Sequence, residues 1–380
     1  MTSNPTAAVS AFSHRVPEAE LDDLRTRLAA ARLPERETVA DGDRWAQGVP
    51  RADLVEVVEY WRDHYDWRVF ERQLDSLGQF RTTVDGVGVH FLHRRSRRRD
   101  ARPLLLTHGW PGSVVEFVDV IEELANPRDP GSPAFHVVTP SLPGFGFSDK
   151  PVAPGWGVGR IAQAWTELMT RIGYERFLAH GGDWGGVITT VLGAQHADHV
   201  EAIHTTFAQV PPGLSEDGLT IQERDWVAST RRFWKERTGY AHQQATGPQT
   251  IGYALVDSPV GLLAWIMDKF AEWSDTTDSP FETISRDRLL DNVTLYWLTR
   301  SGASSARIYA ESYGRLDHSL AVDVPTAVTV YPHDIERYPR PWVQQRYRNL
   351  VRWSTPATGG HFASLEQPHQ FTAEVQAAFA

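Results

Sequence analysis

The first 100 residues contain two different patterns of apolar and polar residues. Apolar residues recur at helical spacing in residues 18–28 and again after Pro50. Residues 80–95 instead alternate between apolar and polar on either side of an Asp-Gly dipeptide, which is typical of a tight hairpin turn. The pattern predicts an N-terminal segment, residues 1–100, with two helices and one β-hairpin.

From residue 101 the pattern changes to short apolar runs separated by longer amphipathic stretches. Residues 104–107, 177–181 and 202–207 are such apolar runs. Strands that alternate with helices are the signature of an α/β fold with a mainly parallel central sheet. We expect the first half of this sheet in residues 101–210.

Residues 211–320 interrupt the alternation with a stretch that is helical in character and rich in large aromatic residues. This insertion predicts a helical lid over a pocket, with most of the aromatic rings packed in the lid's own core. The sheet resumes in residues 321–380, where two β-rich runs, 326–334 and 352–368, each end in a loop. The loops at the carboxyl ends of such strands gather at one edge of the sheet, where ligands bind.

Charge and composition narrow the class of protein. The 380 residues include 38 Lys and Arg, 48 Asp and Glu and no Cys, for a formal net charge of −10. An acidic chain is a poor general binder of nucleic acid or anionic membrane, so the basic run Arg94–Arg99 is expected to be a solvated loop. The lack of cysteine excludes disulfides, thiolate metal sites and cysteine nucleophiles. Since only three of the basic residues are lysine, we expect a bacterial source.

The N-terminal residues and the lengths of the apolar runs indicate where the protein is located. Residues 1–20 lack the basic start and apolar core of a signal peptide. No apolar run approaches the roughly 18 residues that suggest a membrane span. We therefore expect a cytoplasmic protein without a membrane anchor.

The stretch FLAHGGDWGG, residues 177–186, reads as a strand, a turn crowded with glycine and the start of a helix. This is the pattern of a nucleophile elbow, a sharp turn that lifts one side chain above the sheet and requires small neighbours. The nucleophile position holds Asp183. Asp334 and His361 follow on the loops of the last two β-rich runs, in the chain order of an α/β-hydrolase triad.

An aspartate at the elbow suits displacement at a saturated carbon, because carboxylate attack there forms an ester that water can cleave. His361 would activate the water and Asp334 would orient the histidine. The backbone N–H groups of Trp110 and Trp184 would hold the oxyanion formed from the ester. This chemistry opens an epoxide or expels halide from a haloalkane. From a different class, a non-catalytic binding protein on a hydrolase fold is the alternative.

Four further histidines have structural explanations. His90 and His93 lie three apart on a predicted strand, so they face opposite sides of the sheet and form no metal pair. His108 and His180 are expected to make turn hydrogen bonds and to transfer no proton. No metal site and no cofactor site is therefore predicted.

Three motifs resemble those of the microsomal-type epoxide hydrolases, a family of the α/β-hydrolase superfamily. HGWPGS at 108–113 is similar to the family's oxyanion loop, GGDWGG at 181–186 to its nucleophile motif and GGHFASLEQP at 359–368 to its histidine motif. The resemblance covers residues 10–372 and includes the extra N-terminal region that wraps the core in this subgroup. It implies an α/β-hydrolase fold with a mostly parallel sheet, a helical lid insertion and an N-terminal wrapping segment.

The resemblance also implies roles for individual residues. Asp183 matches the nucleophile and His361 the base. The segment YPHD matches the one that carries the acid, and its distance from the histidine favours Asp334 over Glu336.

The family carries two lid tyrosines that bind the epoxide oxygen and donate a proton. RTGYAHQQ resembles the first site and points to Tyr240, and ARIYAESY resembles the second and points to Tyr309. Tyr313, one helical turn further on, is the alternative to Tyr309. Two phenols favour an epoxide over a haloalkane, because an alkoxide needs a proton and a halide does not.

We therefore expect an epoxide hydrolase that needs no cofactor or metal and forms a vicinal diol through an aspartyl ester. Its partner would be a small apolar or aromatic epoxide, and we expect a homodimer with a role in detoxification or secondary metabolism. The candidate substrate-binding residues are all aromatic: Trp110, Trp184, Phe207, Trp234 and Trp265.

Overall fold

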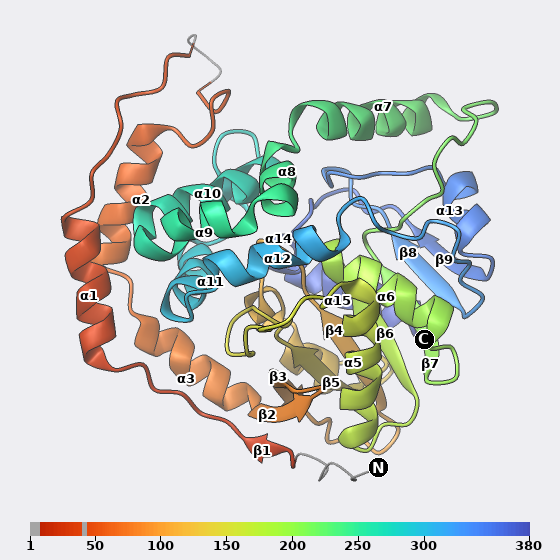
Figure 1. Ribbon diagram of the computed structural model, residues 1–380. Coiled ribbons are helices and arrows are strands. Elements are labelled where there is room, and N and C mark those ends of the chain that lie inside the picture. The colour runs from red at the N-terminus through yellow and green to blue at the C-terminus, as the bar shows by residue number, and fades with distance from the viewer. Residues whose placement is uncertain (1–7, 40–43) are drawn as a thin grey trace.

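The structure is a computed structural model that describes residues 8–39 and 44–380. The first seven residues of the stretch inspected for a signal peptide lie outside the described residues. Within the described chain, one sheet has helices on both faces, and a further group of helices lies above it (Figure 1).

The strands pair in the order β1-β2-β3-β5-β4-β6-β7-β8-β9. Pairing is antiparallel from β1 to β3 and between β3 and β5, and it is parallel across all the others. The mainly parallel sheet is thus confirmed. The strands are β1 (Ser10–Ala11), β2 (Gln79–Val84), β3 (Val87–Arg94), β4 (Arg102–Thr107), β5 (Phe135–Pro140), β6 (Phe177–Gly181), β7 (Val200–Thr205), β8 (Thr326–Thr329) and β9 (Leu350–Ser354).

The parallel strands are covered on both faces, which explains their uniformly apolar sequences. Leu104, Leu105 and Leu106 of β4 point to alternate faces and are all fully buried. The covering helices are α4 (Ile121–Ala125), α5 (Val158–Arg171), α6 (Asp183–Gln195), α13 (Arg340–Arg346), α14 (Ala363–Glu366) and α15 (Pro368–Ala378), with the short 3-10 helix η1 (Val114–Phe117).

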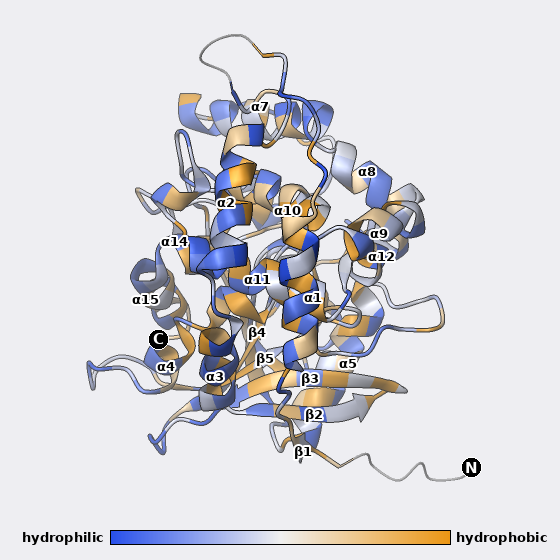
Figure 2. Ribbon diagram, turned by 90° about the vertical axis from the view of Figure 1, so that its left-hand side faces the viewer, coloured by the Kyte–Doolittle hydropathy of each residue, from blue (hydrophilic) through white to orange (hydrophobic). Residues whose placement is uncertain are grey.

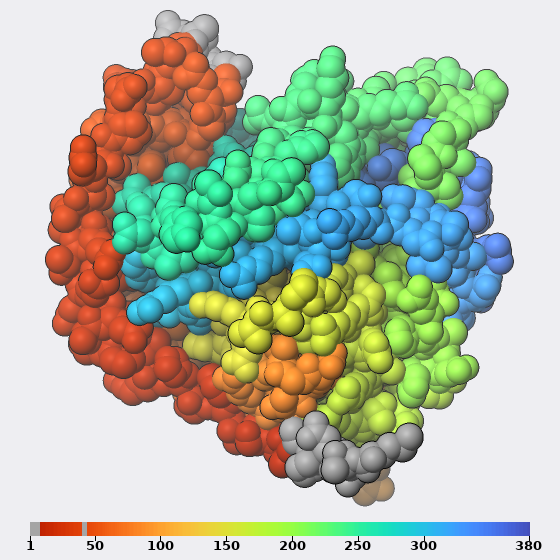
Figure 3. Space-filling model, in the orientation of Figure 1, coloured from red at the N-terminus to blue at the C-terminus, as the bar shows by residue number. Residues whose placement is uncertain are grey.

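The N-terminal segment contains α1 (Glu18–Ala29), α2 (Arg51–Asp63) and α3 (Trp67–Leu77), followed by the predicted hairpin. It runs along one side of the molecule from the sheet to the upper helices (Figures 1 and 3). Helix α3 was not predicted. Asp66 caps it by accepting a hydrogen bond from Arg68 N–H, and its apolar face is buried. Figure 2 shows α1 beside α2 over the core, with α3 below them near the sheet.

The predicted lid contains the helices α7 (Ile221–Glu236), α8 (Gly239–Thr246), α9 (Pro248–Asp257), α10 (Pro259–Trp273), α11 (Arg286–Leu298) and α12 (Gly302–Ser312), with the 3-10 helix η2 (Pro280–Glu282). Side chains cap several of these helices; Thr220 and Glu223, for example, form a capping box at the start of α7. Phe270, Trp273 and Tyr296 are almost fully buried, so part of the aromatic content does form the lid's core.

Hydrogen bonds join α11 to the N-terminal segment. The Trp61 indole N–H donates to Thr294 Oγ1 at 2.9 Å, and the Tyr65 hydroxyl donates to Asp291 Oδ1 at 2.7 Å. Burial raises the pKa of Asp291 to about 6, although the hydrogen bond from Tyr65 and the charge of Arg288 oppose this shift. The segment therefore fixes the lid as well as the sheet.

Two sequence expectations differ from the structure in detail. The strand predicted at 202–207 is β7 and ends earlier, because Thr205 Oγ1 accepts a hydrogen bond from Phe207 N–H and turns the chain. His180 makes no turn bond of the expected kind: its Nδ1 lies 3.0 Å from Nδ1 of His204 inside the sheet. His108 does bond within its turn, to Gly109 O at 3.0 Å.

No single helix in the described residues is long and apolar enough to span a membrane. Helices α9 and α10 meet length and composition criteria only as a pair, and they are bent by 116° at their break. The described residues also contain no cluster of three or more His, Asp or Glu side chains arranged to hold a metal ion.

Candidate active site

The nucleophile elbow lies between β6 and α6. Asp183 has φ 49°, a left-handed backbone conformation that side chains rarely adopt. The tight turn brings β6, α6 and β4 into contact, and a Cβ at Gly185 would overlap the backbone of Thr107. The glycines around Asp183 are thus required by packing, and the elbow places its carboxylate above the end of the sheet.

The turn after β4 supplies one oxyanion donor. Trp110 N–H donates to Asp183 Oδ1 at 2.8 Å, and the Trp110-Pro111 peptide bond is cis. The N–H of Trp184 follows the nucleophile directly in the first turn of α6, and its role as second donor stays a prediction. The turn therefore holds one carboxylate oxygen and leaves Oδ2 for other partners.

His361 connects two carboxylates. Its Nδ1 lies 2.7 Å from Asp334 Oδ1, and its Nε2 lies 3.4 Å from Asp183 Oδ2. All three side chains are largely buried: the exposed fraction is 4 % for His361, 2 % for Asp334 and 13 % for Asp183. The structure thus brings the three predicted triad residues together and selects Asp334, not Glu336, as the partner of the histidine.

The surroundings of His361 set its protonation. Burial alone would lower the pKa of His361, but the charges of Asp334 and Asp183 outweigh it and hold that pKa well above its usual value. In the free enzyme both ring nitrogens of His361 are therefore protonated, and the positively charged imidazolium lies between two carboxylates.

The loop around His361 is tied down by a buried carboxylate. Glu366 accepts hydrogen bonds from the backbone N–H groups on both sides of the histidine, Gly360 at 3.1 Å and Phe362 at 3.0 Å. His361 N–H itself donates to Trp273 O at 2.8 Å, at the end of lid helix α10. The position of the imidazole therefore depends on both the core and the lid.

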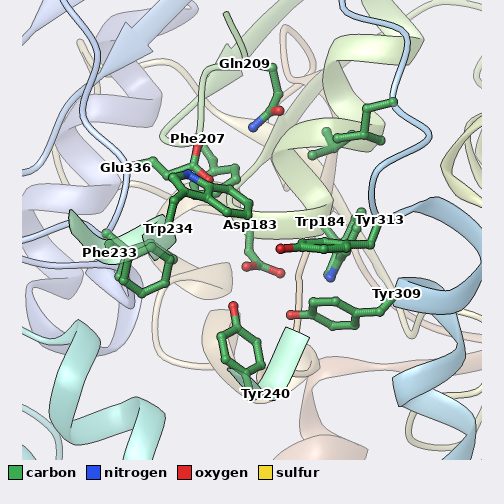
Figure 4. Close-up of a pocket in the computed structure, with 13 residues that line it drawn as sticks. Asp183, Trp184, Phe207, Gln209, Phe233, Trp234, Tyr240, Tyr309, Tyr313 and Glu336 are labelled. Carbon is green, nitrogen blue, oxygen red and sulfur yellow. The ribbon is translucent and has the colours of Figure 1, made fainter. Parts of the chain in front are cut away.

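Two lid tyrosines face the nucleophile. Tyr240 lies on α8 and Tyr309 on α12, and both hydroxyls point toward the Asp183 carboxylate (Figure 4). Burial raises the pKa of both phenols well above 10, and the charge of Asp183 adds to the shift. Both hydroxyls therefore remain protonated at neutral pH and able to donate.

Tyr313 differs from these two. Its pKa is raised by burial, while a hydrogen bond with Thr238 opposes the shift, and the charge that acts on it is that of Glu336. It lies on the same cavity as Tyr309, with ring centroids 6.2 Å apart. Because the charge of Asp183 acts on the pKa of Tyr309 and not on that of Tyr313, Tyr309 is the better candidate for the second tyrosine.

Asp183, Tyr240 and Tyr309 line one cavity. Three of the five predicted aromatic residues also line it: Trp184, Phe207 and Trp234. Trp110 instead stacks behind the Tyr240 ring at 5.1 Å. The prediction for Trp265 is wrong for this cavity. Its indole N–H points to Gln244 Oε1, at 3.4 Å, because this side of α10 packs against α8.

The cavity also has lining residues that the sequence did not suggest. Gln209 follows the carboxyl end of β7, and Glu336 lies two residues beyond Asp334. A position just after a strand end is the only sequence signal for either residue. The remaining residues that were not predicted are apolar: Val187, Phe233, Leu316 and Ile335.

The fold and this site define an α/β-hydrolase with aspartate as the candidate nucleophile, a histidine–aspartate pair and two facing tyrosines. Comparison with family models agrees. Residues 9–117 match the model described as epoxide hydrolase N terminus, and residues 102–243 match the alpha/beta hydrolase fold.

Similarity to known proteins extends over nearly the whole chain. A putative epoxide hydrolase of Stigmatella aurantiaca is 48 % identical over 98 % of this chain and 84 % of its own length. Epoxide hydrolase 1 of Sus scrofa is 32 % identical over 98 % and 90 %. The chain belongs to the microsomal epoxide hydrolase family, and it is an enzyme of that class.

Solved structures agree with this placement. Aspergillus niger epoxide hydrolase superposes with a TM-score of 0.89 at 33 % identity, over 98 % of this chain and 96 % of that one. Juvenile hormone epoxide hydrolase of Bombyx mori gives a TM-score of 0.90 at 30 % identity, over 98 % and 94 %. The expected α/β-hydrolase fold with the N-terminal region is therefore confirmed.

Proposed function

We propose that the enzyme opens an epoxide by attack of Asp183 and hydrolyses the resulting ester with water activated by His361. The observation that carries this proposal is the convergence of one carboxylate and two protonated phenols on one largely apolar cavity (Figure 4). A nucleophile on one side and proton donors on the other are what ring opening needs.

In the first step, Asp183 Oδ2 attacks a ring carbon while Trp110 N–H holds Oδ1. The carbon–oxygen bond of the ring breaks and its electron pair goes to the epoxide oxygen. Tyr240 or Tyr309 gives that oxygen a proton. The products are a hydroxyalkyl ester of Asp183 and a tyrosinate.

Before the second step, His361 passes its extra proton through solvent to the tyrosinate, since the ester no longer carries the charge of Asp183. Neutral His361 then takes a proton from water through Nε2, and the hydroxide attacks the Asp183 carbonyl carbon. Trp110 N–H and, in our proposal, Trp184 N–H stabilise the oxyanion. The ester bond breaks, and the leaving oxygen takes the proton from His361. The diol departs, and the carboxyl proton returns through solvent to His361, which restores the free enzyme.

The two alternatives fit less well. A dehalogenase would share the aspartate, but halide departure would make no use of the two phenols beside Asp183. A binding protein would be favoured by an Asp183 remote from any cavity, whereas Asp183 lines this one.

Formation of the diol from styrene oxide tests the proposal. We expect the wild-type enzyme to produce phenylethanediol and the Asp183→Asn variant to produce none above background. Bromide release from 1-bromohexane is measured in parallel. Bromide release faster than diol formation, with no effect of Tyr240→Phe, would favour the dehalogenase.

Broader proposals on substrate, assembly, location, source and role accompany this mechanism. We propose an apolar or aromatic substrate, since indole, phenyl and aliphatic side chains line most of the cavity. We also propose a cytoplasmic homodimer from a bacterial source, and a role in detoxification or secondary metabolism. Light scattering of the purified protein tests the dimer, for which a molar mass near twice 42.7 kDa is expected.

A further inference from the structure

Two cavities adjoin above Asp183. The inner cavity contains Asp183 and has a volume of about 60 Å³, while the outer one has a volume of about 470 Å³. Their junction is therefore defined by the residues that line both. These are Gln209, Trp234, Tyr313, Leu316 and Glu336.

Two polar side chains at this junction have no role in the mechanism above. Gln209 and Glu336 are each only 7 % exposed. The backbone N–H of Gln209 is held by the Tyr347 hydroxyl at 3.1 Å, and its side-chain amide points into the cavity (Figure 4). The other residues that line both cavities are Trp234, Tyr313 and Leu316, so the amide and the carboxyl are the most polar groups at the junction.

Neighbouring side chains fix Glu336 in place. The Tyr338 hydroxyl forms a hydrogen bond with the Glu336 carboxyl group, and Trp234 in turn forms a side-chain hydrogen bond with Tyr338. A carboxyl group has two oxygens, so one bond to Tyr338 leaves the group capacity for another partner.

The charge state of Glu336 defines which partners suit it. Burial raises the pKa of Glu336 to about 8; the Tyr338 bond and His361 oppose the shift, and the charges of Asp334 and Asp183 favour it. At neutral pH the carboxyl is mostly protonated. It can then donate and accept hydrogen bonds, as the Gln209 amide does.

We propose that Gln209 and Glu336 form a polar subsite that binds a neutral amide or carbonyl group carried by the epoxide a few atoms from its ring. The rest of the substrate extends into the outer cavity. This inference rests on the proposed function and names the class of epoxide: a functionalised chain with an apolar tail.

A purely apolar chain that displaced water from the junction would leave the Gln209 amide unpaired and would offer no second partner to the Glu336 carboxyl. Because leaving buried polar groups unpaired is unfavourable, we expect discrimination against such a chain of about tenfold or more.

The test compares two substrates of matched chain length. N-(oxiran-2-ylmethyl)octanamide carries an amide near the ring, and 1,2-epoxydodecane has carbon at every chain position. We expect kcat/KM of the wild-type enzyme to favour the amide by about tenfold or more. Styrene oxide, which has neither an amide nor a long chain, reports the basic reaction separately.

Variants assign the preference to the subsite. Glu336→Leu and Gln209→Leu should each lower the amide-to-alkane ratio about fivefold to tenfold, since each removes one hydrogen-bonding partner. Glu336→Gln keeps a neutral donor and acceptor and should retain most of the ratio. Glu175→Leu is the matched control, because Glu175 is exposed and precedes β6 at the opposite end of the sheet from Asp183.

Three results would overturn the subsite. They are an equal kcat/KM for both chains in the wild type, an unchanged ratio in Glu336→Leu, or an equal loss on both chains that Glu336→Gln does not restore. Each leaves the proposed function standing as long as styrene oxide yields its diol. If the wild-type enzyme formed no diol from styrene oxide, the proposed function itself would be rejected.

Discussion

The proton on His361 determines when ester hydrolysis can begin. In the free enzyme the carboxylates of Asp334 and Asp183 together hold the pKa of His361 well above its usual value, against the effect of burial. Ester formation removes the charge of Asp183. The pKa of His361 must then fall, so the imidazole loses its proton and becomes a base after the first step has occurred.

This account predicts a lower pKa for His361 in the Asp183→Asn variant than in the wild type. The sign follows from the charge: the raised pKa depends on two negative neighbours, and the substitution neutralises one. An NMR titration of the His361 ring, assigned with His361→Gln, measures it. An unchanged or higher pKa in Asp183→Asn would contradict the coupling.

The two phenols beside Asp183 should matter far more than the third. Tyr240→Phe and Tyr309→Phe each remove a proton donor, so we expect diol formation from styrene oxide to fall ~10²-fold or more in each. Tyr313→Phe is the matched control, and its loss should stay below about fivefold, because a phenylalanine keeps the packing against Tyr309. A Tyr313 variant as slow as Tyr309→Phe would reassign the second tyrosine.

Individual residues were predictable where a local motif carries them. The glycines around Asp183, the turn at Trp110 and the loop at His361 have recognisable sequences, and the structure brings them together. Gln209 and Glu336 had no such motif, because their positions on the cavity arise from how distant loops fold over it. Trp265 was wrongly placed for a related reason.

Trp265 lies on α10, which is apolar around most of its circumference. Its buried residues include Leu262, Leu263, Ile266 and Met267. Periodicity cannot identify the face of such a helix that meets the pocket. Helix α3, by contrast, has apolar residues at helical spacing, Trp67, Phe70, Leu74 and Leu77, so the sequence did contain a signal for it.

Helix α11 does more than cover the pocket. Asn292 Nδ2 donates to Pro111 O at 2.8 Å, and Asn292 Oδ1 accepts from Ser113 Oγ at 2.7 Å. The Tyr296 hydroxyl donates to Gly112 O at 2.7 Å. All these groups are buried, so one lid helix fixes the turn that presents the Trp110 N–H to Asp183.

Asn292 should therefore act as a positioning residue for ester hydrolysis. We expect Asn292→Ala to slow hydrolysis ~10-fold to ~10²-fold, less than the ~10²–10³-fold cost of removing an oxyanion donor outright. Because ring opening depends less on that donor, the ester should accumulate. Quenched-flow mass spectrometry measures both steps.

A purely structural role for Asn292 would slow both steps alike or leave no ester behind. Asn349→Ala is the matched control, since Asn349 is exposed and remote from the turn in sequence. It should leave the partition between the two steps unchanged.

The N-terminal segment, the sheet and the lid form one structure around the site. Trp61 of α2 is 2 % exposed and bonds to Thr294 on α11, which also carries Asn292. Helix α11 thus connects the N-terminal segment, through Trp61 and Thr294, to the turn at Trp110, through Asn292 and Pro111. The arrangement of strands and lid followed from the change of hydrophobic pattern, whereas these long-range bonds could be seen only in the structure.

Removing Trp61 should destabilise the whole molecule. Trp61→Ala leaves a cavity and removes the hydrogen bond to Thr294, and we expect a loss of roughly 3–5 kcal/mol in the free energy of unfolding. Denaturant unfolding followed by circular dichroism measures it. Val69→Ala, at an exposed position of α3, should change stability by less than about 0.5 kcal/mol. Similar values for both variants would show that the segment adds little.

The covalent ester on Asp183 is the central claim, and intact-protein mass spectrometry of His361→Gln with styrene oxide tests it most directly. Without the base, ring opening should proceed while hydrolysis stalls. The account predicts an added mass equal to the whole epoxide, and no such adduct in the double variant Asp183→Asn/His361→Gln. An adduct that survives Asp183→Asn, or no adduct with any epoxide that the wild type converts, would contradict it.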